Sequence, residues 1–144
     1  MRTLVLAAIL LSSVTALAAP GGTIYVLPDA IDLKEADYEA KAKKDSIKTV
    51  ENRDGRWTMF VLAWLKRTPG GKNVEVAFFD KAKKRPDPDS SIVVGTQPSA
   101  KVFATLVNIA DDAGLEAGHT YEMRIKKPGP KGETLASTII ETKK

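Results

Sequence analysis

The chain has 144 residues, with 22 basic and 18 acidic side chains and a formal net charge of +4 at pH 7, and it contains no cysteine and one histidine. A chain of this length fits one domain, and without cysteine it can form no disulfide, thiolate nucleophile or cysteine-based metal site. Lysines cluster at residues 41–48 and again at residues 81–85. The mild charge argues against a nucleic-acid-binding face, because acidic residues accompany both clusters and the aromatic residues lie mainly inside apolar runs.

The N-terminal segment has the order of a secretory signal peptide. Arg2 supplies a positive charge, residues 4–11 are apolar, and residues 16–18 form an A-x-A cleavage site. The apolar run is shorter than the roughly 20 residues of a transmembrane helix, and a Pro-Gly-Gly sequence follows directly. We therefore expect residues 1–18 to be removed on export to the periplasm or the extracellular space. Residues 19–144 would remain as one domain, with no membrane span and no cysteine for a lipid anchor.

The rest of the chain is divided into short runs rich in β-branched and aromatic residues, separated by glycine, proline and aspartate. The run 57–65 is almost wholly apolar, which is typical of a central strand, and the Gly-rich turn after it predicts a hairpin with 73–80. The spacing predicts an all-β sandwich of about seven to eight antiparallel strands rather than an α/β fold. The expected strands are 23–27, 46–50, 57–65, 73–80, 91–96, 101–107, 120–126 and 133–142.

Two segments depart from the strand pattern. Residues 33–43 are rich in Ala, Lys and Glu, and an acidic residue precedes a glutamate by three positions, which is a variant of the capping box. A short helix is expected there, and the alternation of apolar and charged residues leaves a polar edge strand as the alternative. Residues 81–91 contain two prolines and a dense set of charges, so we expect a long surface loop.

The stretch 115–125 carries a resemblance to a known family. Leu115 and a corner containing Gly118 precede a strand that opens with Tyr121 and then alternates. This pattern resembles fibronectin type III and related immunoglobulin-like domains. The resemblance implies an immunoglobulin-like sandwich in which the ring of Tyr121 enters the core and its hydroxyl bonds to the backbone a few residues upstream. It also implies that Gly118 supplies a backbone angle that other residues resist. It extends over residues 115–142 and implies no activity.

The sequence contains few residues suited to catalysis. His119 is the single histidine, so no His-pair metal motif is possible, and no G-x-S-x-G elbow is present. Residues 87–90 offer alternate oxygen ligands for calcium, but the glycine and distal glutamate of an EF-hand loop are missing. Paired carboxylates could serve a glycosidase, although turns and caps explain them equally well. We assign no catalytic, cofactor or metal residue. The candidate acidic pairs are Asp29 with Asp32, Asp87 with Asp89, and Asp111 with Asp112.

These observations favour a non-catalytic binding or structural module, exported to the bacterial envelope or beyond it. Its expected partner is an unknown protein or polymer of the envelope, and nucleic acid is not expected. The alternatives are a small carboxylate-based glycan-processing enzyme and a binder of anionic polymers or polysaccharides. Exposed aromatic rows would favour sugar binding, but Trp57, Trp64, Phe78 and Phe79 lie in apolar runs and are expected to be mostly buried. The one candidate contact surface consists of Lys81, Lys83, Lys84 and Arg85.

Overall fold

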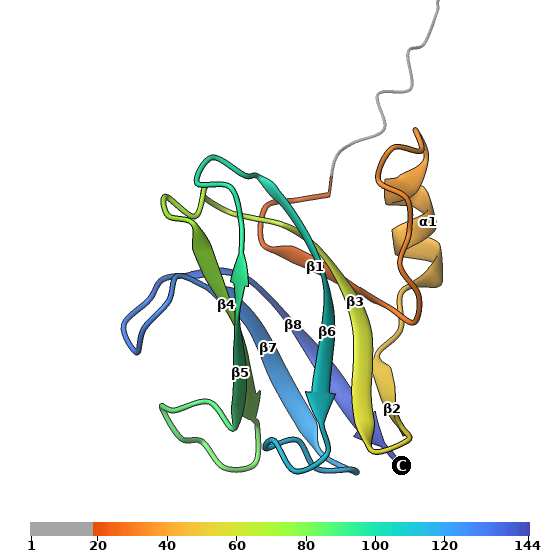
Figure 1. Ribbon diagram of the computed structural model, residues 1–144, viewed down its shortest axis with the longest axis vertical. Coiled ribbons are helices and arrows are strands. Elements are labelled where there is room, and N and C mark those ends of the chain that lie inside the picture. The colour runs from red at the N-terminus through yellow and green to blue at the C-terminus, as the bar shows by residue number, and fades with distance from the viewer. Residues whose placement is uncertain (1–18) are drawn as a thin grey trace, which may run out of the picture.

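The computed structural model describes residues 19–144, so the predicted signal peptide lies outside the described residues. The prediction of a mostly β protein with about eight strands is confirmed (Figure 1). No helix in the part of the chain that the structure describes is long and apolar enough to cross a membrane. In chain order the elements are β1 (Thr23–Leu27), α1 (Tyr38–Asp45), β2 (Thr49–Arg53), β3 (Arg56–Trp64), β4 (Asn73–Asp80), β5 (Ser90–Gly95), β6 (Val102–Ala110), β7 (Thr120–Lys126) and β8 (Thr134–Lys143).

The strands form two hydrogen-bonded groups that β2 joins into one mixed sheet. In the first group β3 pairs antiparallel with β1 and β6, and the second group follows the antiparallel order β8–β7–β4–β5. The start of β2 pairs with β8, at Thr49–Glu51, and its end pairs with the beginning of β3. The β2–β8 pair is parallel, so the prediction of antiparallel strands throughout is wrong. No tight turn joins these two strands, and only a tight turn would force an antiparallel pair.

The predicted hairpin between residues 57–65 and 73–80 is also wrong. β3 pairs with β1, β2 and β6, whereas β4 pairs with β5 and β7. The connection crosses from one group of strands to the other, and its backbone is held on the way. Leu65 N–H donates to the Lys101 carbonyl at 2.8 Å, and Lys66 N–H donates to the Leu135 carbonyl at 2.9 Å. A Gly-rich segment suits such a crossing as well as it suits a tight turn, which is why the turn chemistry was misleading.

The main core collects inward-facing side chains from both groups of strands. Trp57 comes from β3, Phe78 from β4, and Tyr121 from β7, and each is at most 2% exposed. A second, smaller cluster lies on the other face of β3, where Phe60 and Trp64 pack against α1 and β1. Because β3 is covered on both faces, nearly all its residues are apolar. The four aromatic residues expected to be mostly buried are so, with exposures of 2%, 6%, 0% and 9% for Trp57, Trp64, Phe78 and Phe79.

The helix begins five residues later than predicted, at Tyr38 rather than at residue 33. The Asp32 carboxylate accepts the N–H of Lys34 at 2.9 Å, and this local turn takes the place of the expected cap. Tertiary packing positions α1 instead. Ala42 is fully buried in the second cluster, and the Tyr38 ring stacks on Trp64 with centroids 6.3 Å apart. Figure 1 shows α1 beside β1 and β3, so the alternative of a polar edge strand is wrong.

Candidate functional site

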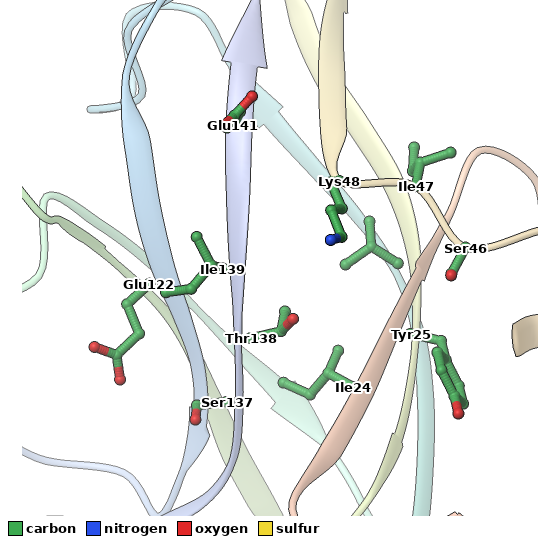
Figure 2. Close-up of a pocket in the computed structure, with 11 residues that line it drawn as sticks. Ile24, Tyr25, Ser46, Ile47, Lys48, Glu122, Ser137, Thr138, Ile139 and Glu141 are labelled. Carbon is green, nitrogen blue, oxygen red and sulfur yellow. The ribbon is translucent and has the colours of Figure 1, made fainter.

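A groove of about 720 Å³ lies between β1 and β8, and we call it the β1–β8 groove (Figure 2). Ile24 and Val26 of β1 line it, and both are core side chains, only 6% and 3% exposed. Figure 2 shows Ile24 and Thr138 facing one another across the gap from the two strands. The groove therefore has an apolar floor that belongs to the main core of the domain.

The groove exists because β1 and β8 are bridged at both of its ends but not between them. At one end Ser137 N–H donates to the Gly22 carbonyl at 3.3 Å. At the other end the segment before β2 lies between the strands. There Ile47 N–H donates to the Val26 carbonyl at 2.8 Å, and the Lys48 carbonyl accepts Glu141 N–H at 2.7 Å.

Between these bridges the two strand edges are open. Successive N–H groups along a strand point to opposite sides, so the N–H of Ile139 faces the groove, as those of Ser137 and Glu141 do. β1 and β8 are not neighbours in the strand order of residues 19–144, so no strand pairing joins the two edges between the bridges. By the same alternation, the backbone of Ile24 faces the groove from β1, between the carbonyls of Gly22 and Val26.

Lys48 places a positive charge over the groove. Figure 2 shows its side chain directed toward the middle of the gap and away from Glu141. Glu122 also borders the groove, but in Figure 2 it points away from the gap, and Arg124 binds its carboxylate at 2.7 Å. The Arg124 guanidinium holds the pKa of Glu122 below its usual range, although burial opposes that shift. The groove thus combines an apolar floor, open backbone groups and one ammonium group.

A second polar site lies at the start of β7, where His119 sits between two carboxylates. The His119 Nδ1 atom lies 2.6 Å from Asp80 Oδ2, and Nε2 lies 3.3 Å from Glu116 Oε2. The three side chains offer ligand atoms within 4.8 Å of one another, which is suitable spacing for a metal ion. However, the carboxylates contact opposite nitrogens of one ring, so a single ion could not replace both contacts. The arrangement is better described as a hydrogen bond between His119 and Asp80, with the Glu116 carboxylate near the other ring nitrogen, than as a metal centre.

Asp89 anchors the basic loop that the sequence suggested as a contact surface. Its carboxylate is 4% exposed and accepts the N–H of Asp80 at 2.7 Å. Lys83 and Arg85 bind the same carboxylate at 3.2 and 2.6 Å. Two of the four candidate contact residues, Lys83 and Arg85, therefore hold the loop itself, and all four are exposed. With both oxygens of Asp89 used by these donors, the loop is poorly suited to calcium.

The corner before β7 contains the three structural residues that the sequence singled out. Tyr121 is fully buried, and its hydroxyl accepts the N–H of Glu116 at 2.9 Å. Leu115 is 1% exposed, and Gly118 has a φ of +80°. Thr142 was not predicted, yet its hydroxyl accepts the N–H of His119 at 3.1 Å and ties the corner to β8. No local sequence signal marks Thr142, because its partner comes from another strand end.

Comparison with known proteins gives no relative for this chain. No family model, no curated protein and no solved structure matches it.

Proposed function

We propose that this chain is a non-catalytic, exported binding module with an immunoglobulin-like fold, and that the β1–β8 groove is its binding surface. The observation that carries the proposal is the open strand edge at Ile139 above a floor of core side chains. Unpaired backbone groups beside apolar surface favour association with a partner that pairs with them.

The order of the strands supports the immunoglobulin-like assignment. Three strands in the order β1–β3–β6 lie across the main core from β8–β7–β4–β5, and β2 passes from one group to the other. A buried tyrosine at the start of β7, bonded to the backbone five residues upstream, agrees with the corner of fibronectin type III and related domains.

Export is supported by the leader pattern of residues 1–18. Ala19, the first residue after the expected cleavage site, packs against the second cluster. Stability without any cysteine is consistent with a domain of this size, since its core is large enough to dispense with disulfides. Binding of anionic polymers is less favoured, because Asp89 pairs with Lys83 and Arg85.

The test uses the full chain, expressed with its leader in the organism that encodes it. A photo-cross-linking amino acid replaces Ile139 in one variant and Val93 in the control, and these positions are 43% and 65% exposed. We expect a defined adduct from position 139 and none from position 93, together with a released chain whose mass corresponds to cleavage after Ala18. Equal labelling at both positions, or none at either, would contradict the binding site, and retention of the leader would contradict export.

A further inference from the structure

We infer that the β1–β8 groove accepts an extended peptide segment that carries a carboxylate. This inference rests on the proposed function, since it names the class of partner for the same groove. A peptide strand is the ligand that matches open backbone groups on two strand edges, and a carboxylate is the group that matches Lys48.

The chain's own segment before β2 shows how the gap between β1 and β8 is bridged. Ile47 donates its N–H to β1, and the next residue, Lys48, accepts an N–H from β8. Two extended residues therefore span both edges at once. A peptide placed end to end with this segment would lie where the same two edges are open, beside Ile139 on one strand and Ile24 on the other.

The length of the groove sets the length of the peptide. The bridges at Ser137 and Glu141 are four residues apart on β8. At about 3.3 Å per residue this spacing is roughly 13 Å, and since both end positions are already bridged, at most three extended residues fit between them. A longer partner would enter and leave through the open side of the groove, so only a short stretch of it needs to be extended.

The side chains of the groove select the peptide's composition. Alternate residues of an extended peptide point to one face, so one set would meet the apolar surface of Ile24 and Val26. Lys48 reaches over the same gap, and a carboxylate beside it would form an ion pair partly shielded from water. The negative charge of the nearby Glu122 is already paired with Arg124, so Glu122 repels an acidic peptide less than an unpaired carboxylate would. Without residues 1–18, which contain Arg2 and no other charged side chain, the net charge of +4 becomes +3, and this charge attracts such a partner over longer distances.

The experiment titrates the purified, ¹⁵N-labelled exported chain with short peptides that are acetylated at the N-terminus and amidated at the C-terminus, and it follows backbone amides by NMR. One set of tetrapeptides alternates Val and Thr and ends in Asp, and the matched set ends in Lys. We expect saturable shifts of the Ile139 and Ile24 amides with the Asp set, and at least tenfold weaker binding of the Lys set. N-methylation of the peptide backbone, which removes its donors, should abolish the shifts.

Charge-reversed variants separate a specific ion pair from general attraction. Lys48→Glu should weaken the affinity for the Asp peptides at least tenfold. Lys101→Glu makes an equal change of charge at an exposed site outside the groove, and it should leave this affinity within twofold of the parent value. A dispersed amide spectrum of each variant shows that the fold persists. Equal binding of both peptide sets, or indifference to Lys48→Glu, would overturn the inference. If position 139 cross-links a partner in cells but no peptide binds, the peptide inference falls while the binding function stands.

Discussion

At the residue scale, single contacts between side chains and backbone hold the corner before β7. Tyr121 could be assigned from its sequence context, because a leucine, a glycine corner and an alternating strand surround it. The contact between His119 and Asp80 could not, because the two residues are 39 positions apart and only the pairing of β4 with β7 brings them together. The same holds for Asp89, whose role depends on the path of the loop after β4.

Removing the Tyr121 hydroxyl tests the corner contact. Tyr121→Phe leaves the N–H of Glu116 without its acceptor, so we expect a loss of about 1–2 kcal/mol in the free energy of unfolding. Urea denaturation measures the change. Tyr25→Phe is the matched control, and we expect it to cost about 0.5 kcal/mol or less, since the Tyr25 ring, which the substitution keeps, makes the contact with Trp64. Equal losses in the two variants would show that the hydroxyl contact adds nothing.

The lowered pKa values of Asp80 and Asp89 lead us to expect that the fold loses stability in acid. Burial raises the pKa of each carboxyl, but hydrogen bonds outweigh it and leave both pKa values lowered. The donors are His119 and the Ala82 N–H for Asp80, and the Asp80 N–H, Lys83 and Arg85 for Asp89. Groups with a lowered pKa stabilise the fold above their ordinary value of 3.8 and lose that contribution as the pH falls through the lowered value.

We therefore expect the free energy of unfolding to decrease below about pH 4, and His119→Gln to make this decrease smaller, because Asp80 loses a donor that lowers its folded pKa below the unfolded value. Urea denaturation at a series of pH values measures both effects. Asp112→Asn, at an exposed position, serves as the control and should leave the profile unchanged. A His119→Gln profile that coincides with the parent would contradict the role given to the His119–Asp80 contact.

At the scale of elements, three strands, β1, β4 and β7, coincide with the residue ranges expected from the sequence, because their apolar and polar residues alternate between clear turn signals. The helix begins later than predicted, because its start depends on packing against β3 and not on a local cap. The hairpin was wrong, because a turn composition does not indicate which strands lie next to each other.

The docking of α1 is tested by adding a charge at each of two neighbouring alanines. Ala42 is fully buried in the second cluster, whereas Ala40 is exposed on the same helix. Ala42→Glu places a charge beneath α1 and should cost about 2 kcal/mol or more, while Ala40→Glu should cost about 0.5 kcal/mol or less. Thermal and urea unfolding measure the difference. Similar costs at the two positions would mean that the helix does not dock through Ala42.

At the scale of the whole molecule, contacts between distant segments close the end of the fold that holds the polar corner. A Cβ atom on Gly114 would lie 1.9 Å from the carbonyl oxygen of Asp89, so the corner before β7 touches the loop after β4 with no room for a side chain. Gly118 has a positive φ as well, but a Cβ atom there would have no neighbouring atom within 4 Å. Substitutions at these two glycines can therefore distinguish the effect of steric contact from the effect of a positive φ.

Gly114→Ala should cost more than about 2 kcal/mol, because backbone must move in two segments, and Gly118→Ala should cost about 1 kcal/mol from its positive φ alone. Chemical denaturation of both variants provides the comparison. Amide shifts that spread to residues 81–89 in Gly114→Ala, and remain local in Gly118→Ala, would identify the contact. Equal losses of stability in the two variants would contradict the close contact between Gly114 and the Asp89 carbonyl.

The sequence by itself determined the β class, the number of strands, the burial of the aromatic residues and the position of the corner tyrosine. These properties follow from local alternation and turn chemistry, which neighbouring residues encode. Only the tertiary structure decided that β2 joins two groups of strands, that β3 and β4 do not pair, and that the edges of β1 and β8 remain open. Strand neighbours depend on the burial of whole faces and on long-range backbone hydrogen bonds, and no short stretch of sequence specifies these. The β1–β8 groove arises from that arrangement, so it could be found only in the folded chain.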